Sequence, residues 1–322
     1  MTATMLAISV AERFLQTSAK SLALGSLYAL VALGFVLVFK ATQTVNFAQG
    51  ALALAGAWFM SLILIDWNIP GRWFGGKWVT FLVALALAAA LTALLGLVIE
   101  RLVIRKMIGE PLFSVAVITL GLEVVIRTIV TDAVSISPRQ LGFPWALGEG
   151  WRVGEAFIPR TYAVAIVAAA LAFVAIFLFF RTRLGIAMRA VAFDQEAAMA
   201  QGISVGKVFA VAWGASAALA CIAGVIGSDA LFAGGGAVSV SVTGLAFRAL
   251  PAVILGGLDS VGGALVGGIV IGAAEVYAGE YLAPHTTTLG VGYQLIVPYL
   301  VMLIVLLVRP YGLWGTPEIR RV

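Results

Sequence analysis

Long apolar stretches separated by short polar breaks recur along the chain from residue 21 to residue 308. A helix needs about 20 apolar residues to cross the hydrocarbon core of a bilayer. Nine candidate spans follow, at residues 21–39, 48–65, 78–99, 112–130, 161–180, 208–228, 242–258, 261–279 and 290–308. The seventh is the weakest, because it is short and holds Arg248 and Pro251 near its middle. The pattern predicts an all-α, polytopic bundle of transmembrane helices.

The composition supports a membrane protein. Hydrophobic residues make up 62% of the chain and charged residues 11%, and the mean hydropathy is +1.09. A soluble domain could not bury so much apolar surface. No polar block is long enough to fold separately, so we expect a single transmembrane domain over residues 1–322. The first residues lack a basic leader and a clear cleavage site, so we expect no removable signal peptide.

Lys and Arg are denser in one set of alternate connections than in the other. The denser set comprises Lys40, Arg101, Arg105, Lys106, Arg181, Arg183, Arg189, Lys207, Arg309, Arg320 and Arg321. Cytoplasmic loops are enriched in basic residues, so we expect the N-terminus outside and the C-terminus in the cytoplasm. The loop at about 131–160 then lies outside and the loop at about 181–207 inside. The basic residues form no stripe, and the net charge of +5 therefore indicates no nucleic-acid partner.

Four charged residues fall inside predicted spans. A charge at the centre of a spanning helix costs about 2.5 to 3.5 kcal/mol on insertion scales, so each should face protein or water. Glu123 and Arg127 are four residues apart and can pair on one helix face. Arg248 has no such neighbour, so its partner must come from another helix, a substrate or a water-filled path. Glu275 lies near the predicted outer end, where we expect it to snorkel.

Two spans have an irregular character. Pro251 and the following pair Gly256–Gly257 predict a kinked or broken seventh span, which bilayers tolerate where the freed backbone meets protein or a cavity. Asn46, Gln49 and Gly50 place amide groups and exposed backbone at the start of the second span. They could line a gate, or Asn46 could cap the helix. We predict that these three residues, Arg248 and Pro251 belong to a translocation pathway.

Glycines add two weaker patterns. The polar, Gly-punctuated entries at residues 42–57 and 234–252 resemble each other, which is consistent with a four-plus-four inverted repeat around the fifth span. The alternative is that Gly is merely common in membrane helices, and this chain holds 36. The eighth span carries small-residue spacings that let another helix approach closely. Its glycines are Gly263, Gly267, Gly268 and Gly272.

The residues needed for most enzyme chemistry are scarce. The single histidine, His285, next to Pro284, reads as a solvated loop residue and offers no histidine-based metal site or catalytic triad. The single cysteine, Cys221, lies in an apolar span and reads as a small buried hydrophobe. No phosphate-binding Walker A pattern occurs, so the chain is not expected to hydrolyse ATP. The sequence predicts no enzyme active site.

The long inner connection holds a short amphipathic segment at about residues 193–201. Its run Glu196-Ala197-Ala198 is followed by Gly202. Small alanines let a helix seat closely in a groove, an acidic residue suits the helix start, and a glycine ends the helix. An ordinary surface helix ended by glycine remains the alternative.

This run resembles the EAA-type coupling motif of ABC importer permeases, and four longer segments extend the resemblance. The segments at 25–57, 181–203, 252–275 and 303–315 resemble, in order and spacing, the branched-chain amino acid ABC transporter permease family. The match is to its shorter subunit, which carries an Asn-Phe-Ala-(His or Gln)-Gly signature. The resemblance covers nearly the whole chain, with Gln49 where the family often has His.

The resemblance implies a bacterial inner-membrane importer subunit of the larger, many-helix type. Its partners would be a second, homologous permease, two cytoplasmic ATPases that hold the ATP and magnesium, and a periplasmic substrate-binding protein. No cofactor is expected in this chain. The residues implied to couple the ATPases to the spans are Arg189, Asp194, Glu196, Ala197, Ala198 and Gly202, with Arg181 and Arg183 orienting the loop.

Substrate identity stays open at this stage. Branched-chain or other small amino acids, urea, short amides and aromatic acids are all handled by relatives of this architecture. A channel or secondary transporter that needs no ATP is a further alternative, but it would require a midplane carboxylate for ion coupling. An intramembrane enzyme would require a clustered acid, base or metal set.

Overall fold

The computed structural model describes residues 10–69, 71, 75–134, 139–146, 148–229, 232, 236–282 and 292–315. His285 and Pro284 lie outside these residues. The long helices are α1 (Val10–Thr42), α3 (Lys77–Leu102), α4 (Leu112–Val134), α5 (Arg160–Phe179), α8 (Val205–Gly227) and α10 (Val261–Tyr281). The shorter apolar elements are α2 (Gln49–Ser61), which continues as the π-helical η1 (Leu62–Asp66), η4 (Val240–Thr243), α9 (Gly244–Gly256) and α12 (Tyr293–Val308). The remaining elements are η3 (Ile104–Met107), β1 (Gly150–Val153), β2 (Ala156–Pro159), α6 (Arg183–Phe193) and α7 (Gln195–Ala200).

The predicted helical bundle is confirmed. In the described part of the chain, seven helices are long and apolar enough to cross a membrane, counting α2 with η1 as one. Two shorter apolar helical segments, η4 with α9 and α12, coincide with the seventh and ninth predicted spans. Large apolar side chains are exposed along α3, α4 and α5, as expected where helices meet lipid. They include Leu82, Leu94, Val125, Ile129, Leu171 and Leu178.

Helix α1 starts earlier than the apolar pattern predicted, at Val10 instead of residue 21. Its first turns carry polar groups that bind other segments at the same end of the bundle. Arg13 pairs with Glu280 of α10, with Nε 2.7 Å from Oε1, and Glu12 accepts a hydrogen bond from the Glu155 amide in the β1–β2 turn. Hydropathy marks the part of a helix that meets lipid, so it could not show this polar extension.

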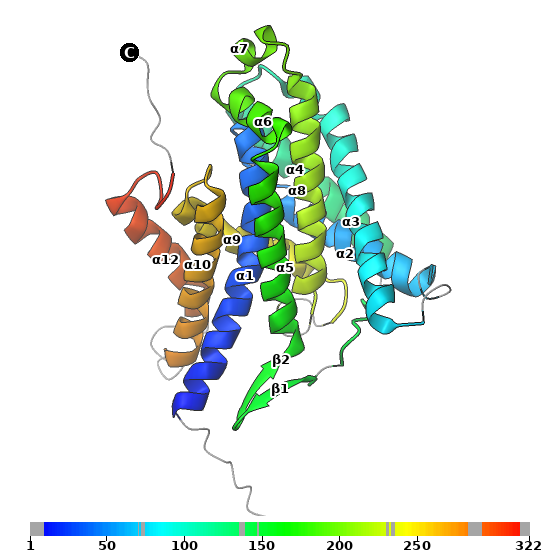
Figure 1. Cartoon of the computed structure of the whole chain (residues 1–322), viewed down its shortest axis with the longest axis vertical. Helices are drawn as coiled ribbons and strands as arrows, with labels where there is room; N and C mark the ends of the chain where they lie inside the picture. The colour runs from blue at the N-terminus through cyan, green and yellow to red at the C-terminus, as the bar shows by residue number, and fades with distance from the viewer. Residues whose placement is uncertain are drawn as a thin grey trace, which may run out of the picture.

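Helices α1 and α8 form the centre of the bundle. Helix α1 packs against α10, α9 and α5, whereas α8 packs against α3 and α2, and α1 and α8 contact each other. In Figure 1 the β1–β2 hairpin and the start of α1 lie at one end of the bundle, and α6 with α7 lies at the other. The two predicted long loops, at about 131–160 and 181–207, are therefore on opposite ends.

The packing pattern fits the four-plus-four inverted repeat. In this repeat, α1, α2, α3 and α4 correspond to α8, α9, α10 and α12. Helix α1 packs on α9 and α10, and in the same way α8 packs on α2 and α3. The second helices of the two repeats also agree in length: α2 and α9 are both 13 residues long, and both follow an irregular segment.

Glycine permits the closest helix crossings. A Cβ atom on Gly268 of α10 would lie 2.6 Å from the Ala29 nitrogen and 2.7 Å from the Gly25 carbonyl oxygen of α1. A Cβ on Gly56 of α2 would lie 2.5 Å from the Cα of Cys221 in α8. The small-residue spacing of the eighth span therefore serves contacts within this chain. Cys221 is fully buried, as predicted for a small core residue.

Candidate functional site

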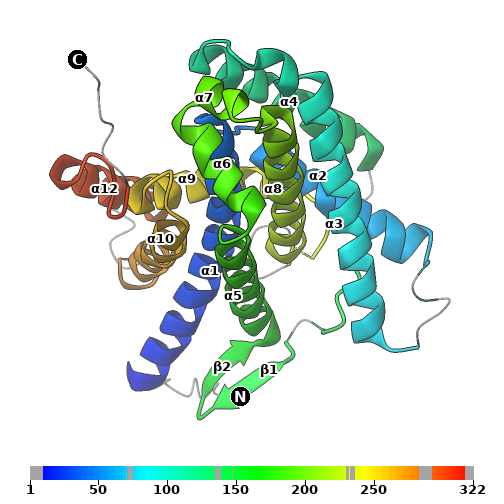
Figure 2. The ribbon, with the colours of Figure 1, turned by 45° about the horizontal axis from the view of Figure 1, so that its top comes forward.

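The connection between α5 and α8 forms a helical hairpin, α6 and α7, at one end of the bundle. Helix α6 was not predicted as a separate element, whereas α7 falls within the predicted segment 193–201. Figure 2 shows the hairpin beside the ends of α1 and α8, and both α6 and α7 contact α8. Thr182 caps α6, since its hydroxyl accepts a hydrogen bond from the Gly185 amide.

Helix α7 has a defined start and end. Asp194 caps the start, because its Oδ1 accepts a hydrogen bond from the Ala197 amide over 2.9 Å. Gly202 ends the turn with φ +80°, a conformation that glycine adopts without strain. The carbonyl oxygen of Ala198 then accepts the amide of Ile203 over 3.0 Å. A six-residue helix is thus fixed at both ends.

The predicted coupling residues divide between the two sides of α7. Ala198 is buried and belongs to the core, whereas Glu196 and Ala197 are exposed. Phe193 and Met199 flank them with exposed fractions of 83% and 50%. The outer side of the hairpin therefore presents an acidic group among apolar side chains.

Helix α6 connects this surface to the centre of the bundle. Helix α6 packs against α1 as well as α8. Arg189, exposed on α6, is near enough to repel Lys40 at the end of α1. The Lys40 ammonium lies over the Phe180 ring, 5.3 Å from its centroid, and is attracted by Asp259 between α9 and α10. The hairpin is thus in direct contact with α1.

Asn46 and Gln49 form a buried polar cluster. Both are at most 1% exposed. The Gln49 Oε1 accepts a hydrogen bond from the Ser216 hydroxyl of α8 over 2.9 Å and lies 3.3 Å from the Asn46 Nδ2 that donates to it. The Asn46 Oδ1 accepts the Ala48 amide, two residues on, which makes a local turn in place of a helix cap.

Gly50 lets the start of α2 lie against the second irregular segment. A Cβ atom there would clash with the Thr243 carbonyl oxygen of η4. The two irregular entries, at about 42–50 and 236–244, therefore meet inside the bundle. Asn46 and Gln49 are buried beside this contact, and Gln49 ties the first entry to Ser216 of α8.

Pro251 does not break its helix. Helix α9 runs through Pro251 and ends at Gly257, whose φ is +101°. A proline leaves the carbonyl four residues earlier without its amide partner, and here that carbonyl, of Phe247, accepts a hydrogen bond from the Tyr299 hydroxyl of α12 over 3.0 Å. The sequence predicted a kink or a break in this span: the helix is not broken at Pro251, where Tyr299 supplies a donor, but it ends at the Gly256–Gly257 pair.

The four intramembrane charges pair in two ways. Glu123 and Arg127 form the expected i,i+4 ion pair on α4, with 3.1 Å between Oε1 and Nε. Glu275 does not snorkel, since it is buried and accepts a hydrogen bond from the Tyr28 hydroxyl of α1 over 2.5 Å. Arg248 is exposed on α9 and interacts electrostatically with both Tyr28 and Glu275. Its partners come from other helices, as predicted.

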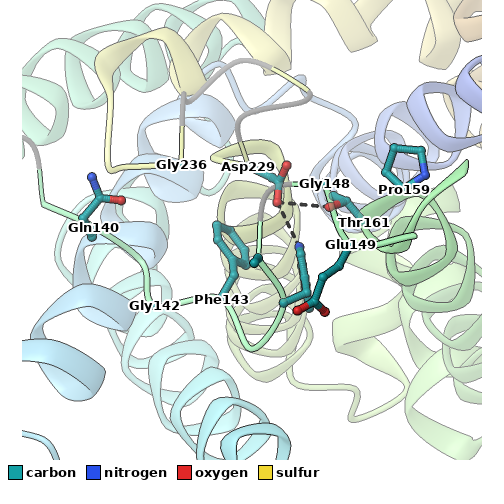
Figure 3. A pocket seen from close by; sticks show the side chains of 11 residues that line it. Gln140, Gly142, Phe143, Gly148, Glu149, Pro159, Thr161, Asp229 and Gly236 are labelled. Atoms are coloured by element: carbon teal, nitrogen blue, oxygen red, sulfur yellow. Dashed lines mark hydrogen bonds between the residues drawn. The ribbon is translucent and has the colours of Figure 1, made fainter. Parts of the chain in front are cut away.

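A small cavity opens at the end of the bundle that carries β1 and β2, beside the start of α5 and the end of α8 (Figure 3). Its volume is about 200 Å³, and Asp229 lies on its wall. The Asp229 Oδ2 accepts hydrogen bonds from Trp145 Nε1 over 3.2 Å and from the Thr161 hydroxyl over 3.1 Å. No local pattern in the sequence indicated this cluster, because its members are 16 and 68 residues apart. The two hydrogen bonds tie Trp145 of the preceding loop and Thr161 of α5 to Asp229 at the end of α8.

The fold and these sites define a multi-pass helical membrane protein of the permease type. The chain belongs to the family described as "Branched-chain amino acid transport system / permease component", whose model matches residues 18–306.

Curated relatives match over nearly their whole length. The high-affinity branched-chain amino acid transport system permease protein LivH of Escherichia coli (strain K12) is 29% identical over 316 residues, which cover 96% of this chain and 98% of LivH. The corresponding permease protein BraD of Pseudomonas aeruginosa is 28% identical with the same coverage. A probable permease protein LivH of Methanocaldococcus jannaschii is 28% identical over 302 residues, covering 90% of this chain and 89% of that protein. No solved structure matches the chain.

Proposed function

We propose that the chain is a permease subunit of a binding-protein-dependent ABC importer for branched-chain or similarly small amino acids. The support is its family membership, together with the names of its relatives LivH and BraD. On this proposal the chain works in the inner membrane beside a second, homologous permease, with its N-terminus outside and its C-terminus in the cytoplasm. Two cytoplasmic ATPases hold ATP and magnesium, and a periplasmic binding protein delivers the substrate.

The observation that carries the proposal is the exposed surface of the α6–α7 hairpin. Phe193 and Met199 are large apolar side chains exposed on the α6–α7 hairpin, which lies at one end of the bundle. Apolar groups with the acidic Asp194 and Glu196 among them fit a groove with apolar walls and a basic rim. Glu196 and Ala197 lie on this surface, while Asp194, Ala198 and Gly202 give α7 its shape.

The α6–α7 hairpin would also transmit movement of the ATPases to the membrane helices, in addition to binding them. Closure of an ATPase dimer would push α7, and α6 would pass the displacement to α1 and α8, which it contacts. Helix α1 contacts α8, α9 and α10, so the displacement reaches both halves of the repeat. The irregular entries that hold Asn46, Gln49 and Gly50 on one side, and Arg248 and Pro251 on the other, form the moving part of the pathway.

The test is charge reversal at Glu196. In the complex reconstituted with its partner permease, ATPases and binding protein, Glu196→Lys should abolish the ATP hydrolysis that the loaded binding protein stimulates, while membrane insertion is retained. Asp132→Lys is the matched control, because Asp132 is an exposed carboxylate at the opposite end of the bundle. Stimulated hydrolysis that survives Glu196→Lys at the control level would remove the coupling assignment.

A further inference from the structure

A polar stripe runs along one face of the η4–α9 segment. Ser241, Gly244 and Arg248 are spaced three and four residues apart, which places them on one side of a helix. Ser241 and Arg248 are exposed, and a Cβ atom on Gly244 would meet nothing within 4 Å. The exposed faces of α4 and α5 carry Val, Ile and Leu at such positions. Ser241 and Arg248 make the η4–α9 segment more polar than the exposed faces of α4 and α5, although Val240 and Phe247 are exposed beside them. A charged and a hydroxyl group at these positions fit a face that meets water or solute.

Arg248 is the charged group on this face. An arginine facing hydrocarbon costs about 2.5 to 3.5 kcal/mol at the membrane centre, so its exposed guanidinium must meet water, protein or solute. On its inner side, Tyr28 and Glu275 form a buried pair with 2.5 Å between the hydroxyl and carboxylate oxygens. Arg248 lies close enough to interact electrostatically with both members of that pair, and its side chain is exposed.

The donor count leaves capacity for a further acceptor. A guanidinium carries five N–H donors in a planar fork, and the phenol and carboxylate behind it can occupy only part of that fork. Glu275 already accepts a hydrogen bond from the Tyr28 hydroxyl. The N–H groups that face the stripe match the two oxygens of a carboxylate.

We propose that Arg248 receives the carboxylate of the solute as it passes along the Ser241–Gly244–Arg248 face, and that Tyr28 and Glu275 position the guanidinium. The proposal rests on the proposed function and narrows its substrate class to solutes that carry a carboxylate, in preference to urea or neutral amides. Because Glu275 shares the positive charge, the contact stays weak. A transport path needs binding that is favourable enough for entry and weak enough for release.

The chain offers a clean chemical test, because Cys221 is its single cysteine and is buried. In a Cys221→Ala background, Arg248→Cys should lower the leucine imported per ATP hydrolysed by about tenfold, the value of one charge-assisted hydrogen bond. Treatment with aminoethyl methanethiosulfonate, which adds an ammonium group to the thiol, should restore at least half of that ratio. The uncharged methyl reagent and the anionic sulfonatoethyl reagent should not.

Tyr28→Phe tests the positioning role. This substitution removes only the hydroxyl. In a chain that keeps Arg248, it should lower the leucine imported per ATP hydrolysed several-fold. Arg127→Gln, on the α4 face, is the matched control and should leave the ratio unchanged. A purely structural role for the Tyr28 hydroxyl would lower the yield of assembled complex and leave the leucine-to-ATP ratio of the remaining complex intact.

Several results would overturn the proposal. Equal rescue by the neutral reagent, or an undiminished ratio in Arg248→Cys, would show that the positive charge is not used. If Arg248→Cys does not assemble, Arg248→Lys and Arg248→Gln give the same comparison, with import expected to survive only in the lysine variant. A failure of the proposed function would give a different result. In that case the complex with the unchanged chain would import no leucine even when ATP is supplied.

Discussion

The crossing of α1 and α10 at Gly268 gives a quantitative test of the packing. A Cβ atom at this position would lie 2.6 Å from the Ala29 nitrogen and 2.7 Å from the Gly25 carbonyl oxygen, whereas ordinary contact begins at 3.4 Å. The Gly268→Ala variant must therefore move the two helices apart by about 1 Å or distort them, and overpacking of this kind costs about 1 to 3 kcal/mol.

Gly121→Ala is the matched control. Gly121 lies inside α4, and a Cβ atom there meets nothing within 4 Å. Both substitutions gain the same helix propensity, about 1 kcal/mol, so the difference between them isolates the clash. We expect Gly268→Ala to be less stable than Gly121→Ala by about 1 to 3 kcal/mol.

The assay is thermal unfolding of the detergent-solubilised chain, followed by loss of the monodisperse peak in size-exclusion chromatography. A difference of 1 kcal/mol corresponds to about 2 to 4 °C in the midpoint for a domain of 150 to 250 residues. Gly268→Ala should therefore unfold at least about 2 °C below the control. Equal midpoints would refute the close approach of α1 and α10.

Three further substitutions test other parts of the account. Gln49→Leu should destabilise the chain by about 1 to 3 kcal/mol, because it leaves the buried Asn46 amide without its acceptor; thermal unfolding measures this, and an unchanged midpoint would contradict the buried cluster. Glu100→Gln should weaken the two hydrogen bonds from Arg105, whose guanidinium also holds the start of α8; hydrogen exchange near residue 206 should then speed up, while Glu100→Asp retains partial protection. Asp194→Ala should remove the cap of α7, worth about 1 kcal/mol; exchange at the Ala197 amide should quicken, and an equally fast amide in Asp194→Asn would argue against capping.

The sequence predicted those features that depend on local spacing. The nine apolar stretches coincide with apolar helices because hydropathy over about 20 residues reflects the thickness of the bilayer. The pairing of Glu123 with Arg127 followed from their separation by one helical turn. The place of α7 followed from an acidic start and a glycine end.

Features that depend on distant contacts escaped prediction. Tyr28 and Glu275 are 247 positions apart, so nothing local showed that Glu275 would be buried instead of snorkelling. The hydroxyl of Tyr299 that accommodates Pro251 lies on another helix. The sidedness of the bundle also stays a prediction, because the alternation of helices fixes which loops share an end but not which end faces the cytoplasm.

Uptake by reconstituted vesicles tests the central claim most directly. Vesicles containing this chain, its partner permease, the ATPases and a loaded binding protein should accumulate leucine only when ATP is supplied on the side that carries the α6–α7 hairpin, and vesicles with Glu196→Lys should not. Leucine uptake at full rate without nucleotide, or with this chain alone, would contradict the account.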